Sequence, residues 1–308
     1  MSFLASGVVQ LTTLPIVLWL YGEVSVLGIF LNLLVLPTVG IVLGSGTAGA
    51  LLGLVTVRGA FLAVVPGRII LRGYEFLTVL LGRLSFCTWI GGAPEIWQCV
   101  VYYVLLFGGI QIALFLKEKG AYRVWRVLSR GICVAVVCVS IFILGFRQKN
   151  LISITCLDIG QGDGIVIQLP GGKTVMVDGG SSSKKKVASY QILPYLKNQG
   201  ISVVDAMLIS HTDLDHISGV QELLTLKEKH LTTLRIKNLL LPDWKAPEEV
   251  YYELEEQAKR CGISVLRLHQ GQKLRFGDGS LEILSPETCA KGTDVNEEGI
   301  VMELRYGK

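Results

Sequence analysis

Six consecutive residues in the second half of the chain concentrate side chains that could do chemistry. Two imidazoles and two carboxylates fall together as His211, Asp213, Asp215 and His216. Imidazole nitrogen and carboxylate oxygen are the ligands that a divalent Zn or Mn ion takes when it keeps an open position for water. The first hypothesis is therefore a hydrolytic metal site that holds one or two such ions.

The flanking segments place this cluster on a loop. Residues 203–210 form an apolar run that is short enough for a strand, and residues 217–224 begin a helical pattern. In a tight loop alternate residues turn toward one point, so three of the four side chains would face one cavity, and His216 would enter from the next turn. A polar turn in which Asp213 or Asp215 caps the helix is the alternative, but it explains fewer of the four groups.

Two further acidic residues are candidate neighbours of such a site. Residues 174–180 read as a strand that ends in Asp178 and two glycines. A carboxylate there suits a group that orients a metal ligand, although a turn-initiating Asp is an open alternative. Asp163 lies in a glycine-rich turn between two predicted strands and is a possible site neighbour.

A basic loop follows Asp178. It contains three consecutive lysines, Lys184, Lys185 and Lys186. Such a run is most often a solvated surface, but beside a metal centre it would neutralise the charge of a nucleic-acid backbone without reading sequence. Residues 187–198 then read as a helix with a kink or break at Pro194.

The hydrophobic residues are concentrated before residue 147. The whole chain is 51% hydrophobic. Residues 1–146 contain nine Lys+Arg and four Asp+Glu, whereas residues 147–308 contain twenty and twenty-one. The clearest candidate membrane spans are residues 26–42, 97–116 and 131–146, each near the length needed to cross a bilayer. The chain is therefore expected to have a membrane part followed by a part outside the membrane.

Three other apolar segments are less clear. Residues 8–20 are interrupted by a proline, and residues 48–65 contain Arg58, for which a loop or membrane-boundary position is preferred to a pore-lining one. Residues 69–86 contain three charges and fit an interfacial helix at least as well as a span.

The orientation follows from the connector at residues 117–130. It carries five basic residues and one acidic residue, which marks it as cytoplasmic by the positive-inside rule. The next span then leads outward. The part after residue 146 is therefore expected to be extracytoplasmic.

Several motifs, taken in order, resemble a known family. Residues 157–163, 176–180 and 208–219 look like the metallo-β-lactamase-fold domain of the ComEC family, which are bacterial membrane proteins that carry transforming DNA across the inner membrane. The first half resembles that family's competence membrane domain around residues 14–15 and 32–37.

The resemblance implies a multi-pass α-helical membrane region over residues 1–146. It implies an α/β domain over residues 147–308, an αββα sandwich of the metallo-β-lactamase fold. The implied metal-binding cluster is His211, Asp213, Asp215 and His216, and the implied catalytic residues are Asp215 and Asp178. Asp213 occupies a position where many hydrolases of this fold have a second His. This makes the site richer in oxygen, so Mn competes with Zn.

The function implied is an extracytoplasmic nuclease that degrades the DNA strand not imported. Bound divalent ions lower the pKa of water from about 15.7 to about 7 and stabilise charge on phosphoryl oxygens. Asp215 is the candidate for positioning a second ion and Asp213 for the first. The implied partners are single-stranded DNA, membrane lipids, other competence proteins and further copies of the chain.

The chain also departs from the family pattern. Residues 296–308 resemble the strand before the family's next acidic metal-ligand motif, and neither that motif nor the later His motif is found in the sequence. We therefore expect a C-terminally truncated metallo-β-lactamase-fold domain whose activity is open. An inactive transport or scaffold fragment, and a membrane-anchored hydrolase of another substrate, remain alternatives.

Overall fold

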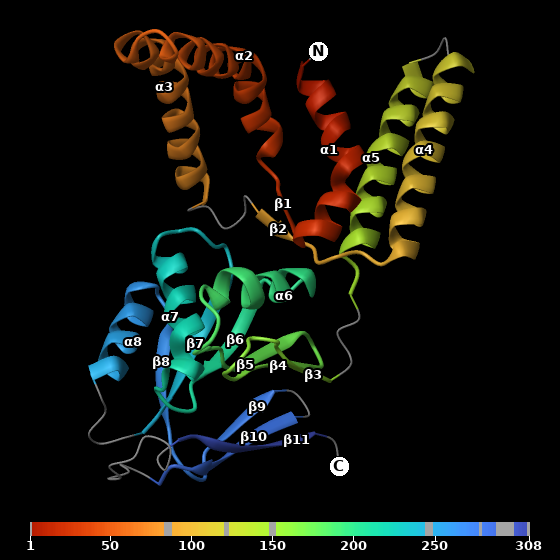
Figure 1. Ribbon diagram of the computed structural model, residues 1–308. Helices are drawn as coiled ribbons and strands as arrows, with labels where there is room; N and C mark the ends of the chain where they lie inside the picture. Colours follow the sequence, from red (N-terminus) through yellow and green to blue (C-terminus); the bar gives the residue numbers. More distant parts are fainter. Residues whose placement is uncertain are drawn as a thin grey trace.

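A region of long helices comes first in the structure and a mixed α/β domain follows it (Figure 1). The computed structural model describes residues 2–82, 88–119, 123–147, 152–243, 249–276, 279–287 and 299–306. The predicted division between residues 146 and 147 falls between the last long helix and the first strand of the domain. It remains a prediction about where two units separate.

The helical region consists of two helix pairs and a first helix. The helices are α1 (Ser2–Tyr21), α2 (Gly28–Gly53), α3 (Val57–Gly82), α4 (Ile96–Lys119) and α5 (Arg123–Gly145). Helix α2 packs on α3, and α4 packs on α5. Two short strands, β1 (Glu23–Ser25) and β2 (Thr88–Ile90), pair antiparallel at the end of this region that faces the α/β domain (Figure 1).

Three helical segments are long and apolar enough to cross a membrane. They are Leu34–Gly53, Ile96–Leu116 and Val127–Gly145. At most 22% of each segment is buried inside the protein, so its apolar side chains face outward. Each overlaps one of the three clearest spans predicted from sequence, and the prediction of an apolar helical region is confirmed.

The apolar segment over residues 48–65, whose spanning the sequence left open, is divided between two helices, and Arg58 lies in the first turn of the second one. Helix α2 ends at Gly53 and α3 begins at Val57, so this segment contains a turn between two packed helices. A Cβ atom added at Gly49 would lie 2.3 Å from Val64, which shows how closely small residues let the two helices approach. Residues 69–82 continue α3, and residues 83–86 of the predicted interfacial helix lie outside the described residues.

The α/β domain is built on a six-stranded sheet. Its strands, in spatial order, are β3 (Ser153–Cys156), β4 (Gly164–Leu169), β5 (Lys173–Asp178), β6 (Val203–Leu208), β7 (Arg235–Pro242) and β8 (Ser264–Leu268). The first three strands pair antiparallel, and β5 to β8 pair parallel. The parallel strands are joined by η2 (Ala188–Ile192) with α6 (Leu193–Asn198), by α7 (Leu214–Glu228) and by α8 (Glu249–Arg260).

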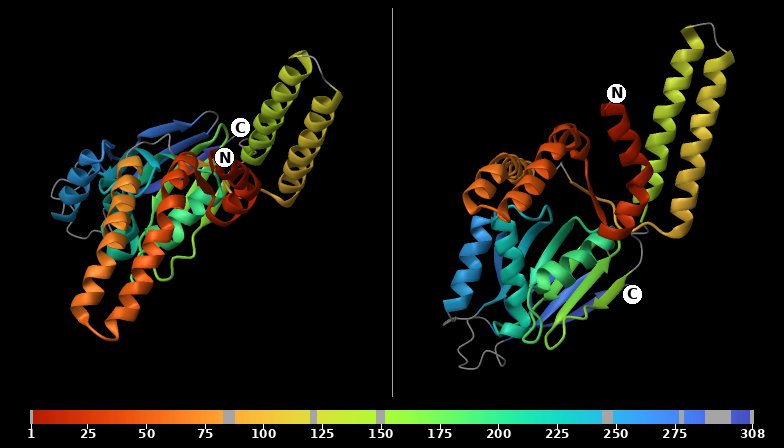
Figure 2. Two further views of the ribbon diagram at one scale, coloured as in Figure 1. Left: turned by 90° about the horizontal axis from the view of Figure 1, so that it is seen from above. Right: turned by 45° about the horizontal axis from the view of Figure 1, so that its top comes forward.

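A second, three-stranded sheet covers the other face of the first one (Figures 1 and 2). Its strands are β9 (Lys273–Phe276), β10 (Gly279–Ser285) and β11 (Val301–Tyr306), all antiparallel. The described residues of the α/β domain thus form three layers, one of helices and two of β-sheet. They confirm a helical region followed by a mixed α/β domain. The outer helical layer of the expected αββα sandwich is not among the residues that the structure describes.

The strands that carry the site are buried on both faces. In β5, Met176 packs under the helices, whereas Val175 and Val177 pack between the two sheets. In β6, Met207 packs under the helices and Leu208 packs between the two sheets. Burial on both faces explains why these strands read as continuous apolar runs in the sequence.

The helix expected over residues 187–198 forms as one continuous run, without the break predicted at its proline, and changes from π to α geometry just before that proline. The π-helical turn η2 precedes α6, and Pro194 lies in the first turn of α6, where a residue without a backbone N–H is tolerated. Glu222 of α7 accepts hydrogen bonds from the backbone N–H groups of Ala188 (2.8 Å) and Ser189 (3.3 Å). The start of this element is therefore tied to α7.

A buried carboxylate in the first half of β6 connects β6 to its neighbours β5 and β7. Asp205 is 8% exposed and accepts hydrogen bonds from Lys237 (2.7 Å), the Thr174 backbone N–H (3.1 Å) and Lys173 (3.3 Å). Burial disfavours the charged form, but these three donors outweigh burial and lower the pKa of the Asp205 carboxyl group.

We expect Asp205→Asn to destabilise the α/β domain by about 1–2 kcal/mol at pH 7, because the lysines lose their charged partner while remaining partly exposed. The pKa of Asp205 is lowered on folding, so its stabilisation is present above the unfolded pKa of about 3.9 and is lost as the pH falls through the folded pKa. Chemical denaturation at pH 7 and at acidic pH measures this difference. Glu256→Gln on the exposed face of α8 is the control, and a wild-type advantage that persists undiminished in acid would contradict the prediction.

Candidate metal centre

Three loops meet at the carboxyl ends of the parallel strands β5 and β6. The backbone N–H of Asp163 donates to the Asp215 carbonyl (3.0 Å), and that of Gly179 donates to the His216 carbonyl (2.9 Å). The loops approach so closely that a Cβ atom at Gly180 would lie 2.5 Å from the His216 carbonyl carbon. This is the edge of an open α/β sheet where ligands commonly bind.

The Asp178 carboxylate is the centre of the hydrogen-bond network. It is 4% exposed, and its Oδ1 accepts from the Ser210 backbone N–H (2.7 Å). Its Oδ2 accepts from Ser210 Oγ (2.6 Å) and lies 3.0 Å from His216 Nδ1. Asp178 also has a φ of +55°, an uncommon conformation for a residue other than glycine. This backbone geometry turns the side chain back toward the loop that follows β6.

Both histidine rings are held through the same nitrogen. Ser210 Oγ lies 2.9 Å from His211 Nδ1 and 3.4 Å from His216 Nδ1. The two ring centroids are 3.8 Å apart. A hydrogen bond at Nδ1 fixes the orientation of an imidazole ring and leaves Nε2 available to a cation, which is the usual arrangement around metal-binding histidines.

A carboxylate oxygen lies near each Nε2 atom. Asp213 Oδ2 is 3.5 Å from His211 Nε2, and Asp163 Oδ2 is 3.7 Å from His216 Nε2. Both separations are too long for a strong hydrogen bond. They are close to the roughly 3.4 Å that separates two tetrahedral ligands held about 2.1 Å from one ion.

Asp215 lies in the first turn of α7, next to His216. Helix α7 begins at Leu214, earlier than the helical pattern suggested, so Asp215 and His216 are helical residues and not loop residues. Asp213 is the N-cap residue, but its side chain makes no capping hydrogen bond. The helix-cap alternative is therefore met by the position of Asp213 but not by a hydrogen bond of its side chain.

The electrostatics of the cluster favour a cation. The hydrogen bond to Asp178 raises the pKa of the His216 imidazole, burial opposes this rise, and the nearby Asp215 and Asp163 carboxylates add to it. Several carboxylates thus surround two imidazoles at one sheet edge. A bound divalent cation would relieve their mutual repulsion.

The imidazole and carboxylate groups of the cluster are suitable ligands for a divalent ion. Their distances, however, bring them together in pairs. Within the described residues, no group of three or more His, Cys, Asp and Glu side chains lies close enough together to hold an ion. The structure brings together His211 with Asp213 and His216 with Asp163, and the two His rings contact each other at an interplanar angle of 46°.

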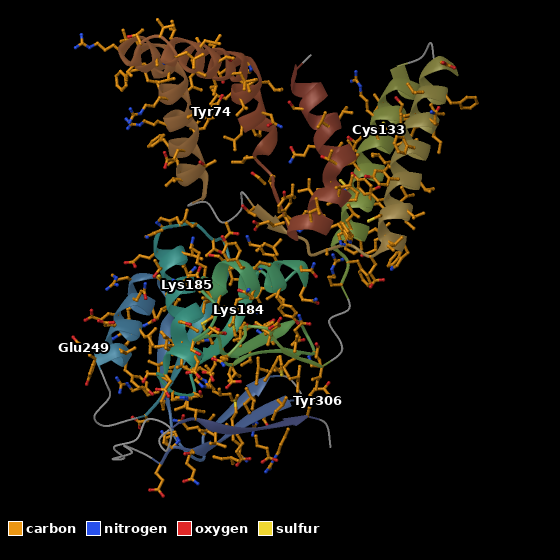
Figure 3. All side chains as sticks on the ribbon, viewed as in Figure 1. Tyr74, Cys133, Lys184, Lys185, Glu249 and Tyr306 are labelled. Atoms are coloured by element: carbon orange, nitrogen blue, oxygen red, sulfur yellow. The ribbon has the colours of Figure 1, made fainter. Side chains whose placement is uncertain are left out.

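The three predicted DNA-binding lysines behave differently from one another. Lys184 Nζ donates to Asp158, at 3.0 Å to its carboxylate and 2.9 Å to its carbonyl. Lys185 and Lys186 are exposed on the same loop, between β5 and η2. Figure 3 labels Lys184 and Lys185 on this loop. The loop of Lys184 also contacts the loop that carries Asp163, since the Ser183 hydroxyl accepts from the Gln161 N–H.

Sequence reasoning missed Ser210. Its hydroxyl joins Asp178 to both histidines, yet a serine at the end of an apolar strand carries no chemical signature of its own. The signal that could have found it is its position, directly before His211. Asp163, noted only as a neighbour, is placed beside His216 Nε2.

Comparison with protein families finds two matches in this chain. Residues 1–116 match the competence protein family, and residues 157–299 match the metallo-beta-lactamase superfamily. The three soluble motifs that resemble the ComEC family, which begin at residue 157 and end at residue 219, lie inside the second match.

Similar proteins of known name agree with these matches. ComE operon protein 3 of Bacillus subtilis is 24% identical over 326 residues, covering 99% of this chain and 39% of that protein. Recombination protein 2 of Haemophilus influenzae is 33% identical over 100 residues, covering 32% of this chain and 12% of that protein. The chain thus spans about two fifths or less of the length of these relatives.

Among solved structures, the metallo-beta-lactamase fold protein YhfI from Bacillus subtilis is similar at 18% identity. The similarity covers 48% of this chain and 52% of that one, with a TM-score of 0.32.

The chain combines a competence protein domain with a metallo-beta-lactamase superfamily domain. This combination and the two relatives are consistent with the ComEC family, so the resemblance predicted from the motifs is confirmed. Proteins of the metallo-β-lactamase fold generally bind divalent metals, which agrees with the donor set found here.

We expect Asp178→Asn to lower the affinity for Mn²⁺ or Zn²⁺ by about 10- to 100-fold, the usual effect of removing a carboxylate that orients a metal-binding His. Asn tolerates the positive φ, so the backbone should be retained. Titration of the metal-free protein by calorimetry measures the change. Asp205→Asn removes a different buried carboxylate from the same sheet and should bind metal as the wild type does. Equal losses in both variants would show that Asp178 acts only through stability.

Proposed function

We propose that the α/β domain is an extracytoplasmic, metal-dependent phosphodiesterase within a DNA-uptake protein of the bacterial inner membrane, and that it degrades the strand not imported. The proposal rests on the similarity to competence proteins together with the site at the sheet edge. Its substrate is single-stranded DNA, and it uses one or two Zn or Mn ions.

One observation carries the proposal. Asp178 and Ser210 hold both histidine rings through Nδ1, so the two Nε2 atoms are left beside the Asp213 and Asp163 carboxylates. A polar cluster with a purely structural role does not require that both histidines be held through Nδ1 and keep Nε2 free of hydrogen bonds to neutral groups. The arrangement supports a metal site, because Nδ1 is held by the protein and Nε2 is left for an ion.

The residues of this chain would divide the work in the following way. His211 and Asp213 would hold a first ion, while His216 and Asp215 would hold a second, with Asp163 beside them. When bound, a divalent ion supplies Lewis-acid stabilisation of a phosphoryl oxygen and activation of water. Asp178 would keep His216 in one tautomer, and Lys185 and Lys186 would hold the phosphodiester backbone near the cluster.

The location of the domain follows from the charge of the connector between α4 and α5. Its basic residues favour the cytoplasmic side for that connector, so α5 would carry the chain outward. Residues 120–122 of the connector lie outside the described residues. The three apolar helices support the membrane location of the region that precedes the α/β domain.

A transport or scaffold role without cleavage is the second candidate. It is favoured by the pairwise spacing of the donors, because within the described residues no three of them gather around one point. A metal-dependent hydrolase of another substrate is the third candidate, since this fold supports many chemistries.

We expect the purified full chain, loaded with Mn²⁺, to degrade single-stranded DNA, and Asp215→Asn to lower kcat/KM by at least about 100-fold, because a carboxylate that positions an ion is removed. A fluorescent oligonucleotide assay with and without chelator measures the activity. Glu256→Gln changes an exposed carboxylate of α8, away from the cluster, and serves as the control. Cleavage that survives Asp215→Asn and chelation would remove the metal assignment, and bound metal without cleavage would favour the scaffold role.

We expect the double change Lys185→Gln with Lys186→Gln to weaken DNA binding with little change in kcat. For single-stranded DNA, removing one lysine that neutralises a phosphate should reduce the slope of log affinity against log salt by about 0.7. Fluorescence anisotropy across a salt series measures the slope. Lys229→Gln, at the far end of α7, should leave it unchanged, and an unaltered slope in the double variant would show that the lysine loop is only a solvated surface.

A further inference from the structure

A polar cavity lies in the seam between the helical region and the α/β domain. Its volume is about 440 Å³. The helical region contributes β2 with Trp89 and the end of α5, and the α/β domain contributes the turn before β6 and the first residue of β7, Arg235. Arg147, which follows α5, reaches into the same cavity. Two arginines thus face one space where two parts of the protein meet.

Arg147 has an unsatisfied buried donor at this place. Its Nη1 donates to the carbonyls of Leu144 (2.9 Å) and Phe146 (2.8 Å) and to Gln98 Oε1 (3.2 Å). Its Nη2 is buried and has no hydrogen-bond partner among the described residues. A buried cationic donor without an acceptor is costly. The Glu95 carboxylate acts on the Arg147 guanidinium through space, so what Nη2 lacks is an acceptor oxygen in direct contact.

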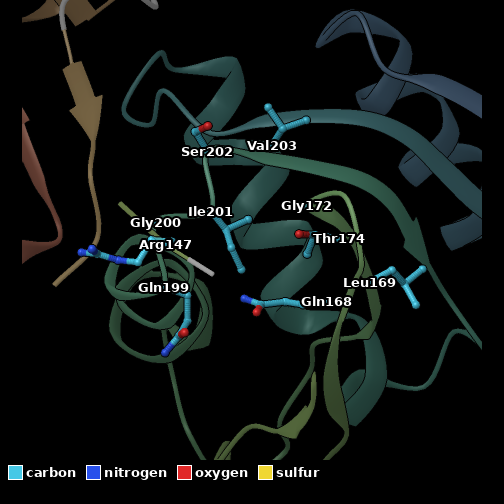
Figure 4. A pocket seen from close by; sticks show the side chains of 10 residues that line it. All are labelled: Arg147, Gln168, Leu169, Gly172, Thr174, Gln199, Gly200, Ile201, Ser202 and Val203. Atoms are coloured by element: carbon cyan, nitrogen blue, oxygen red, sulfur yellow. The ribbon is translucent and has the colours of Figure 1, made fainter. Parts of the chain in front are cut away.

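A smaller polar cavity of about 170 Å³ also has Arg147 in its lining (Figure 4). It is lined by Gln168, Gln199 and Thr174 together with Arg147. Figure 4 shows Arg147 beside Gly200 and Gln199 at one end of this space. Arg147 therefore lines both polar cavities, and Gln168, Gln199 and Thr174 offer further hydrogen-bonding groups to a polar ligand.

An apolar cavity adjoins the polar one through a shared residue. It has a volume of about 500 Å³ and is lined by Leu11 and Leu14 of α1, Val24 of β1 and Ile141 of α5. Trp89 lines this cavity and also the polar cavity that contains Arg147. A single ligand could therefore place a charged end and an apolar end on the two sides of one indole ring.

The seam lies at the level expected for a membrane surface. Exposed aromatic residues gather at the ends of the apolar helices on this side: Trp19 is 61% exposed, Tyr21 is 66% exposed and Trp97 is 52% exposed. Trp and Tyr are enriched where the hydrocarbon layer meets water. The polar cavity thus falls at headgroup depth, while the apolar cavity lies between helices on the hydrocarbon side.

We propose that this seam is a binding site for one anionic phospholipid, whose phosphoryl headgroup pairs with Arg147 and Arg235 and whose acyl chain occupies the apolar cavity lined by Leu11 and Ile141. A free phosphate ion or a DNA phosphate would satisfy the arginines but would leave the apolar cavity unfilled. A zwitterionic lipid would fill the apolar cavity but would match the two cationic side chains less well.

The test uses the full chain in detergent, offered phosphatidylglycerol and phosphatidylcholine in equal amounts, with retained lipid counted by native mass spectrometry. The wild type should retain phosphatidylglycerol in preference, by about fivefold for each arginine. Arg235→Gln changes an exposed residue at the start of β7 and should reduce the preference without unfolding the protein. Arg147→Gln should reduce it as well, and Arg260→Gln, on the exposed face of α8, should not.

A second measurement locates the acyl chain. Phosphatidylglycerol with brominated acyl chains should quench tryptophan fluorescence in the wild type, and part of that quenching should be missing in Trp89→Phe. Equal retention of both lipids by the wild type, or an equal loss in Arg260→Gln, would overturn the proposal. Displacement of the lipid by millimolar inorganic phosphate or by an oligonucleotide would assign the arginines to those ligands instead, and quenching that is identical in Trp89→Phe would exclude the apolar cavity.

Discussion

The buried Asp178 carboxylate is the interaction on which the site depends. The backbone of Asp178, at the end of β5, has a left-handed conformation. Its Oδ1 accepts the Ser210 backbone N–H, and its Oδ2 accepts the Ser210 hydroxyl and lies beside His216 Nδ1. One side chain thereby connects the end of a strand, the loop after the neighbouring strand and the first turn of α7. Because a buried charge without partners is strongly disfavoured, each of these contacts is also a condition for the loops to keep their arrangement.

The register of the sheet explains why these residues meet. Val177 of β5 pairs with Leu208 of β6 in a parallel ladder, so the residues that follow the two strands emerge side by side. Gly164 pairs with Asp178 across the antiparallel ladder, which brings Asp163 to the same edge. The site is therefore assembled from three segments that are separated in sequence and adjacent only through strand pairing.

This origin also decides what could be predicted from the sequence. The cluster from His211 to His216 could be recognised from the sequence because folding alone does not require two His and two Asp within six residues. The apolar helices could be recognised because each is defined by the composition of one continuous segment. The contribution of Ser210 depends on the register between β5 and β6, which no local pattern reveals. The tie between Lys184 and Asp158 depends in the same way on two loops that meet only in the folded domain, and the turn between α2 and α3 depends on close packing of small residues.

The contact between the two parts of the protein is made largely by backbone. Gly22 has a φ of +68°, and a Cβ atom there would lie 2.4 Å from the carbonyl group of Lys197. The Ala93 N–H donates to the Asn198 carbonyl (2.8 Å), and Lys197 pairs with Glu23 at 2.6 Å. Main-chain docking of this kind resists rocking and swivelling. The sheet edge that carries His211 and His216 consequently keeps a fixed distance from the ends of the apolar helices.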